Sequence, residues 1–146
     1  MLTCKNAAKY FLALADDEDA GELISNMKLQ KLLYYAQGFY LAKYGKPLFD
    51  AKIEAWSLGP VVPEVYHEYK SYGSDAIKLS EKLDFSVYDE DAREMLDEVY
   101  AVYGQFSAWK LSQMTHDELP WKKYHTKDDR TIPAKVLKEY FVTQLG

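Results

Sequence analysis

The sequence predicts a mainly α fold: a single compact domain of about six helices, with one short extended segment or small hairpin near residues 52–56. The chain has 146 residues, a common size for one domain, so residues 1–146 are expected to share one core. Apolar residues make up 48% of the chain and charged residues 28%, a balance typical of folded globular proteins. Along most of the chain the apolar residues recur at helical spacing.

The first helix is expected over residues 3–16, with Thr3 as its cap. Its apolar face consists of Ala7, Ala8, Phe11, Leu12 and Ala15. The run Asp16-Asp17-Glu18-Asp19 follows, and like charges this dense end a helix and stay in water. We interpret this run as a solvated loop. The functional alternative is an anionic edge that meets a basic partner.

The second helix is expected to be capped by Ser25 or Asn26 and to end at Tyr44, just before Gly45. One broad stripe along it is apolar and a second is only half polar, a pattern typical of a helix at the centre of a fold. Gly38 in its middle weakens the helix by roughly 1 kcal/mol relative to Ala. This loss is most easily recovered if another backbone packs closely there.

Residues 47–63 are the least helical part of the chain. Residues 52–56 alternate apolar and polar side chains, which predicts a short extended piece, and Gly59-Pro60 marks a turn. Pro63 suits the first turn of a third helix, because its missing N–H breaks no hydrogen bond there. This helix is expected over residues 63–72, before Gly73.

Three further helices complete the prediction. One spans residues 89–103, with carboxylates at its positive end; one begins near Phe106 or Ser107 and runs through Met114; the last spans residues 133–144. Between the last two, Thr115-His116-Asp117-Glu118 has the form of a capping box, which opens a short turn before Pro120 and Trp121.

No pattern in the sequence predicts catalysis. Phosphate loops, dinucleotide fingerprints, nucleophile elbows and zinc-protease helix motifs are missing. The spacing of His116 and His125 fits no metal-ligand pattern, and Cys4 lacks a neighbouring base. No carboxylates are visibly paired in an apolar setting that raises a pKa. We therefore expect no enzyme activity, no cofactor and no metal. A small metal-dependent hydrolase using both histidines is the weakest alternative.

Charge and cysteine content predict where the protein works. A lone cysteine fits a reducing cytosol. No apolar run approaches the ~18 residues of a membrane-spanning helix, and residues 1–5 do not lead into the apolar core of a signal peptide. The expected location is the cytoplasm. The net charge of −5 disfavours nucleic acid and favours a basic protein partner.

Tyrosine is the positive signal, with 13 copies in the chain. Tyrosine combines a rigid apolar ring with a polar tip and is enriched at protein interfaces. Tyr34 and Tyr35 are adjacent, and adjacent side chains on a helix point about 100° apart. We expect at least one of the two to lie at an edge or an interface.

Several motifs together resemble a known family. They are residues 28–38 (KLQKLLYYAQG), 47–49 (PLF), 53–56 (IEAW) and 59–66 (GPVVPEVY), followed by Leu111-Ser112, Thr115-His116, Glu118 and Pro120-Trp121. In this order they resemble the Panacea domain, the SocA-like antitoxin domain that also occurs in phage-associated GepA-like proteins. The resemblance spans roughly residues 3–142. Leu58 departs from it, because the family often has an aromatic residue before Gly59-Pro60.

The resemblance implies an antitoxin, often prophage-associated, that neutralises a co-encoded protein toxin by direct binding. It also leaves open an adaptor role toward a ClpXP-type protease. The alternative function is a DNA-binding autorepressor, which the negative net charge disfavours. The candidate partner-binding residues are Gln30, Tyr34, Tyr35, Gln37, Trp56, Pro60, Val61 and Tyr66. The motif residues expected to be structural are Gly59, Thr115, His116 and Trp121.

Overall fold

The computed structural model describes residues 1–17 and 24–145, so Glu18 and Asp19 of the expected acidic loop lie outside the described residues. The elements in chain order are α1 (Cys4–Asp17), α2 (Asn26–Tyr44), β1 (Glu54–Trp56), β2 (Gly59–Val61), α3 (Pro63–Tyr69), η1 (Lys70–Tyr72), η2 (Phe85–Val87), α4 (Glu90–Tyr103), α5 (Ala108–His116), α6 (Leu119–Tyr124) and α7 (Ala134–Val142), where η marks a 3-10 helix. The mainly α single domain with a small hairpin is confirmed.

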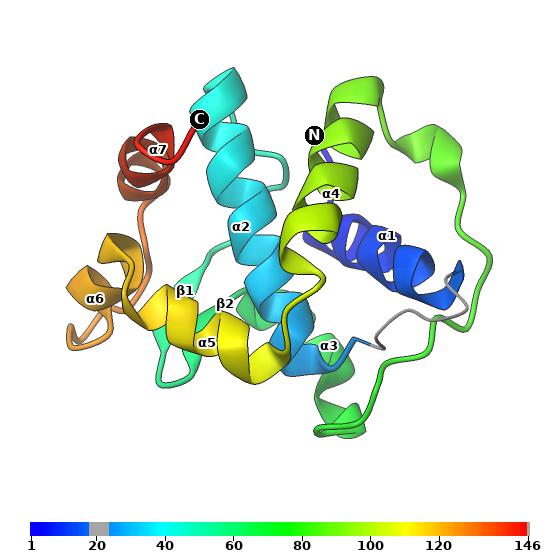
Figure 1. The fold of residues 1–146 in the computed structure, drawn as a ribbon, viewed down its shortest axis with the longest axis horizontal. Coiled ribbons are helices and arrows are strands. Elements are labelled where there is room, and N and C mark those ends of the chain that lie inside the picture. Colours follow the sequence, from blue (N-terminus) through cyan, green and yellow to red (C-terminus); the bar gives the residue numbers. More distant parts are fainter. Residues whose placement is uncertain (18–23, 146) are drawn as a thin grey trace.

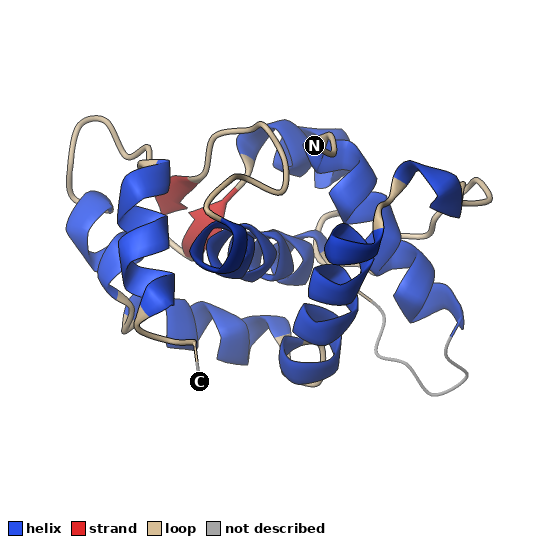
Figure 2. Ribbon diagram, turned by 90° about the horizontal axis from the view of Figure 1, so that it is seen from above, coloured by secondary structure: helices blue, strands red, loops and turns tan. Residues whose placement is uncertain are grey.

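Helix α2 lies at the centre of the molecule. It is flanked by α4 on one side and α7 on the other, while α5 crosses near its N-terminal half (Figure 1). Seen end-on, α2 is surrounded by the other helices and the hairpin (Figure 2). Most of its residues are buried, including polar ones, because its neighbours cover it on nearly every side. The central placement predicted from its weak polar face is confirmed.

Local signals fix most helix ends. The side chains of Ser25, Asp89 and Ser107 accept hydrogen bonds from backbone N–H groups at the starts of α2, α4 and α5, as expected of N-caps. Gly45 adopts a φ of 73° just past α2, where its N–H bonds to the carbonyl of Leu41. The third helix is shorter than predicted, since residues 70–72 tighten into 3-10 geometry before Gly73.

Three local features differ from the prediction. Thr115–Glu118 is not a capping box: α5 continues to His116, and the Thr115 hydroxyl donates to the carbonyl of Ser112 within that helix (2.7 Å). Residues 119–124, where only a short turn was predicted, form a helix of their own, which brings the described part of the chain to seven α-helices, close to the expected number. At Gly38 the close neighbour is the ring of Phe141 on α7 and not a backbone; a Cβ there would lie 2.2 Å from the ring.

The hairpin is a two-stranded antiparallel sheet in which Glu54 pairs with Val61 and Trp56 with Gly59. Its outer edge is covered by the segment before α7. The N–H of Ala55 bonds to the carbonyl of Arg130, and the N–H of Ile132 bonds to that of Ile53 (both 2.8 Å). The hairpin is therefore held on the body of the molecule by backbone bonds, with its turn at Ser57 and Leu58 projecting outward.

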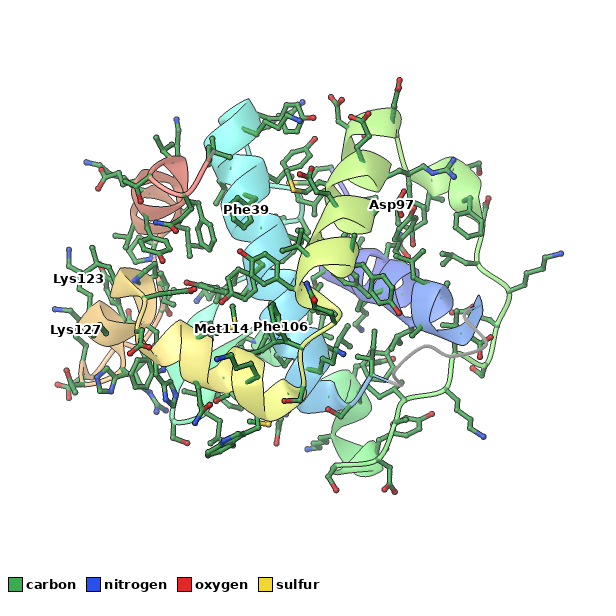
Figure 3. The ribbon with its side chains drawn as sticks, viewed as in Figure 1. Phe39, Asp97, Phe106, Met114, Lys123 and Lys127 are labelled. Carbon is green, nitrogen blue, oxygen red and sulfur yellow. The ribbon has the colours of Figure 1, made fainter. Side chains whose placement is uncertain are left out.

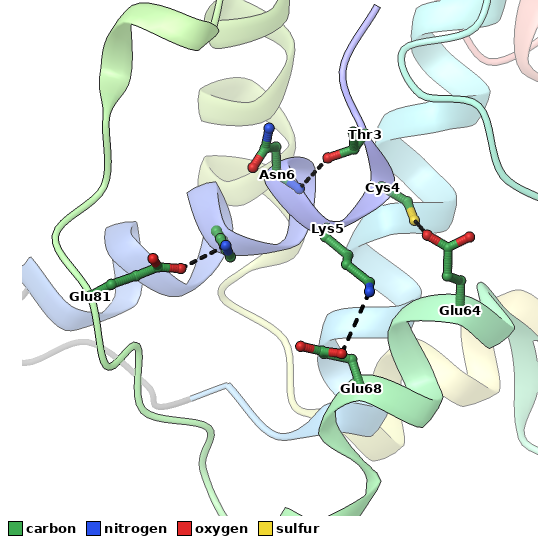
Figure 4. A network of polar contacts seen from close by, with 8 residues as sticks. Thr3, Cys4, Lys5, Asn6, Glu64, Glu68 and Glu81 are labelled. Carbon is green, nitrogen blue, oxygen red and sulfur yellow. Dashed lines mark hydrogen bonds and ion pairs between the residues drawn. The ribbon is translucent and has the colours of Figure 1, made fainter.

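The start of α1 is joined to α3 by side-chain contacts (Figure 4). The thiol of Cys4 donates to Glu64 (3.1 Å), and the ammonium of Lys5 lies 3.6 Å from the carboxylate of Glu68. Burial, together with the Glu64 carboxylate, raises the pKa of Cys4 to about 12. Such a thiol is protonated at neutral pH and is a poor nucleophile.

Candidate protein-binding face

Two buried glutamines of α2 hold non-helical segments in place. The side-chain oxygen of Gln37 accepts from the N–H groups of Leu48 and Phe49 (2.9 and 3.2 Å), while its amide donates to the carbonyl of Phe49 (2.8 Å). The oxygen of Gln30 accepts from the N–H of Val62 (2.9 Å), just before α3. These bonds satisfy backbone groups that the fold has removed from water.

Tyr34 and Tyr35 converge on a single carboxylate. Each hydroxyl donates to a different oxygen of Glu118 (both 2.8 Å), the residue at the start of α6. Burial raises the pKa of Glu118 to about 7, although the two tyrosine hydrogen bonds favour the ionised form. The same burial and the nearby carboxylate raise the pKa of both tyrosines. Glu118 is thus a single partly buried carboxylate, not one of a pair, and sequence reasoning missed it because its tyrosine partners lie more than 80 positions away.

Lys31 is buried beneath the hairpin. Its ammonium donates to the carbonyl of Pro60 (3.2 Å), and loss of hydration lowers its pKa to about 7. Its aliphatic stem and the hydroxyl of Thr115 crowd Gly59, where a Cβ would lie 2.6 and 2.7 Å from them. Gly59 has a φ of +117°, so both the backbone conformation and the packing require glycine. Gly59 and Thr115 therefore join the hairpin, α2 and α5.

Six of the eight predicted partner-binding residues have almost no exposed surface in this conformation: Gln30, Tyr34, Tyr35, Gln37, Pro60 and Val61. The expectation that Tyr34 or Tyr35 lies at an edge was wrong. Both are buried, because the central position of α2 gives it covered walls on several sides. Direct contact between these six residues and a partner stays a prediction. In the structure, Gln30 bonds to the residue before α3, and Tyr34 and Tyr35 bond to the residue before α6.

Trp56 and Tyr66, the other two, are partly exposed and touch each other. Their ring centroids are 5.0 Å apart in an edge-to-face arrangement, and His67 adds a third ring at 5.5 Å from Tyr66. Such edge-to-face pairs are favoured by the charge distribution of aromatic rings. The strand β1 and helix α3 thus place a small aromatic cluster at the surface.

A second aromatic group lies beside the first. The indole of Trp121 stacks between His116 and His125, with centroid distances of 4.0 and 3.9 Å. Its N–H donates to the carbonyl of Trp56 (2.7 Å), which joins the two groups. His116 in turn lies 3.1 Å from the carbonyl of Ser57 in the hairpin turn. His116 and Trp121, expected to be structural, therefore tie α5 and α6 to the hairpin while keeping partly exposed rings.

Two more apolar side chains extend this surface into solvent. Leu58 in the hairpin turn is 49% exposed, and its carbonyl accepts from the hydroxyl of Ser112 (2.6 Å). Trp109, 63% exposed, lies seven residues before His116, so two helical turns place both side chains on the same side of α5. We define the hairpin face by the following residues: Trp56, Leu58, Tyr66, His67, Trp109, His116, Trp121 and His125.

The sequence interpretation missed Trp109 and treated Leu58 only as a departure from the family pattern. Trp109 carried a usable signal, since Leu111, Ser112 and Thr115 place the buried side of α5 away from it. All three tryptophans of the chain lie on the hairpin face. Tryptophan and tyrosine carry much of the binding energy at protein interfaces.

The structure also bears on the metal, hydrolase and membrane predictions. Within residues 1–17 and 24–145, no three His, Cys, Asp or Glu side chains gather in a way that could hold a metal ion. The two histidines proposed for a hydrolase flank an indole ring instead of a shared ligand position. In the same part of the chain, no helix combines the length and apolar character needed to cross a bilayer.

Comparison with known proteins agrees with the family resemblance. The family described as "Antitoxin SocA-like, Panacea domain" matches residues 29–122, which include every predicted site residue. The curated protein "Antitoxin SocA" of Caulobacter vibrioides is 36% identical over 103 residues, covering 64% of this chain and 55% of that protein. The chain thus spans about half the length of this relative. No solved structure gives a significant match. The chain belongs to the SocA-like antitoxin family and carries its Panacea domain.

Proposed function

We propose that this chain is the antitoxin of a toxin–antitoxin pair and that it neutralises a co-encoded protein toxin by binding it with the hairpin face. The observation that carries the proposal is the joining of Trp56, Trp121 and His116 at the hairpin, next to the exposed side chain of Leu58, with Trp109 exposed on the same helix as His116. Family membership supports the antitoxin role.

The hairpin face has the physical properties of a protein-binding surface. Its rings are held in place by stacking and by the Trp121–Trp56 hydrogen bond, so little side-chain entropy is lost on binding. Leu58 and Trp109 present apolar surface that gains free energy when a partner covers it. A stable complex buries at least ~1,000 Å², and a few aromatic anchors commonly dominate its energy.

The buried polar layer supports this surface from below. Lys31 bonds to the hairpin, Gln30 to the residue before α3, and Glu118 receives two hydrogen bonds at the start of α6. Three of the four segments that carry the hairpin face, namely the hairpin, α3 and α6, are therefore fixed to α2. In this proposal the predicted residues Gln30, Tyr34 and Tyr35 act by positioning the face, without touching the toxin.

The proposal is tested by coexpression with the product of the neighbouring open reading frame. Expressed alone, that product should arrest growth, and the present chain should restore growth and copurify with it at near-equal amounts. Leu58→Ala and Trp109→Ala should each weaken copurification and rescue. Val87→Ala is the matched control for Leu58→Ala, because Val87 is 47% exposed on η2, outside the hairpin face.

Failure of the chain to bind or rescue any neighbouring product would count against the antitoxin role. If Leu58→Ala and Trp109→Ala rescue growth as well as wild type, the antitoxin role would stand, but the hairpin face would not be the toxin-binding surface. Toxin abundance separates two modes of neutralisation. Inhibition by binding alone leaves the toxin level unchanged, whereas delivery to a ClpXP-type protease shortens the lifetime of the toxin in cells that contain the protease.

A further inference from the structure

A second candidate binding surface, which shares no residue with the hairpin face, lies between α2 and α4. It is a groove of about 450 Å³ near the C-terminal end of the described chain. Its apolar lining consists of Phe39, Met95, Val99, Val102, Tyr103 and Leu145. Val102 is 46% exposed and Leu145 is 44% exposed, so the groove offers apolar surface to solvent. Figure 3 shows Phe39 on α2 and, on the other bordering helix, Asp97.

The solvent side of this groove is strongly acidic. Along α4, Met95, Val99 and Val102 form a stripe at i, i+4 and i+7, and Asp91, Glu94 and Glu98 form the adjacent exposed stripe. Glu98 lines the groove itself, and Glu94 and Glu98 lie beside Lys43 at its rim, whereas Asp97 accepts a hydrogen bond from the hydroxyl of Tyr10 on α1 (2.7 Å). The carboxylates of Asp91, Glu94 and Glu98 thus accompany one ammonium group along this edge.

Besides Lys43 at the rim, α4 carries one positive side chain, Arg93, which lies over the ring of Phe85 (5.6 Å), and a larger group of positive charges lies on other elements. Lys122, Lys123, Lys127 and Arg130 follow one another on α6 and the turn after it. Lys123 and Lys127 appear at the opposite side of the molecule from Asp97 (Figure 3). The distribution of charge is therefore uneven, and the field at the α2–α4 groove attracts cations.

We propose that the α2–α4 groove binds an amphipathic helical segment of a partner protein, with apolar side chains in the groove and Lys or Arg residues facing the acidic stripe of α4. Helices that enter such grooves insert apolar residues at i, i+4 and i+7 spacing, and the apolar stripe of α4 from Met95 to Val102 offers them a wall of similar length. Charge complementarity selects a basic helix over an acidic one. This site is separate from the hairpin face and does not depend on the toxin-binding proposal.

The probe is a short synthetic helical peptide with leucines at i, i+4 and i+7 and lysines beside them. A second peptide has the same leucines but glutamates in place of the lysines, and a third is a scramble of the first. Binding to the full chain is measured by fluorescence anisotropy at increasing sodium chloride concentrations. The basic peptide should bind with one-to-one stoichiometry and weaken as salt rises, whereas the acidic and scrambled peptides should bind at least about tenfold more weakly.

Variants locate the binding site. Glu94→Gln/Glu98→Gln should weaken the basic peptide at least about fivefold at low salt, while Glu90→Gln/Glu139→Gln makes the same charge change away from the groove and should not. Val102→Asn should also weaken binding, with Val87→Asn as the control of equal exposure. Absence of basic-peptide binding up to millimolar concentration would overturn the proposal, as would equal binding of the three peptides or indifference to the groove variants.

Sedimentation of the chain without peptide tests the competing occupant, a second copy of this protein. A monomer that stays a monomer in Val102→Asn agrees with a partner helix. A dimer that Val102→Asn dissociates would show that a second copy fills the groove and would overturn the proposal. None of these measurements involves the toxin, so failure here is distinguishable from failure of the hairpin face.

Discussion

Glu118 and Lys31 are two ionisable side chains that folding removes from water, and each makes stability depend on pH. The pKa of Glu118 rises from 4.5 to about 7, so between these values the folded chain holds a proton that the unfolded chain has released. Its contribution to stability is fully present below pH 4.5 and is lost as pH rises through about 7, a change on the order of 3 kcal/mol. In Glu118→Gln this part of the pH dependence should disappear. Urea unfolding of both proteins across pH 4–8 measures it, and parallel profiles would contradict it.

Lys31 acts in the opposite direction at higher pH. Its pKa falls from 10.5 to about 7 on folding, because the buried ammonium loses hydration and gains a single carbonyl acceptor. Between these values the unfolded chain binds a proton that the folded chain does not, so stability should decline as pH is lowered from 10.5 to 7. Lys31→Met should flatten this interval and stabilise the protein at neutral pH. A wild-type profile without a slope there would show that Lys31 keeps an ordinary pKa.

Gly59 gives the sharpest test of packing at a single residue. In Gly59→Ala the new methyl group would collide with Lys31 and Thr115 in a backbone conformation unfavourable to L residues, so a loss of at least ~3 kcal/mol is expected. Gly73→Ala is the control, because Gly73 also has positive φ but a methyl group added there would meet no neighbour within 4 Å. Denaturant unfolding should rank Gly59→Ala as clearly the more destabilised. Equal losses would mean that only backbone strain matters.

At the scale of elements, the contact between α2 and α7 depends on the space at Gly38. Helix propensity alone predicts that Gly38→Ala stabilises the protein by roughly 1 kcal/mol. The ring of Phe141 occupies the space of the new methyl group, so overpacking should instead destabilise it by about 1–3 kcal/mol. The sign of the change in unfolding free energy decides between the two. Stabilisation would show that α7 can shift without cost.

The boundaries of the elements were largely predictable, whereas the roles of polar residues inside them were not. Ser25, Asp89 and Ser107 cap helices through backbone groups three residues away, a range that sequence patterns capture. Gln37 and Gln30 bond to segments 11 to 32 positions away. Sequence spacing carries no signal for such bonds. Gln30 and Gln37 were therefore predicted to bind a partner, whereas the structure places both in the core.

At the scale of the whole molecule, the two candidate surfaces differ in what sequence could reveal. Trp56, Tyr66, His116 and Trp121 were singled out by motif, but the stacking that unites them depends on how α5, α6 and the hairpin meet. The α2–α4 groove left no motif, because its lining comes from three segments that are apolar for ordinary helical reasons. Composition predicted binding as the function; only the fold shows where binding surfaces are available.

The central claim is that the hairpin face holds a protein toxin. The most direct measurement is the dissociation constant between the purified chain and the toxin encoded beside it, by calorimetry, for wild type, Leu58→Ala, Trp109→Ala and Val87→Ala. Leu58→Ala and Trp109→Ala should each weaken binding at least about fivefold, since loss of a central aromatic or apolar anchor commonly costs over ~1 kcal/mol, and Val87→Ala should bind like wild type. Wild-type affinity in both hairpin-face variants, with unfolding free energies unchanged, would contradict the claim.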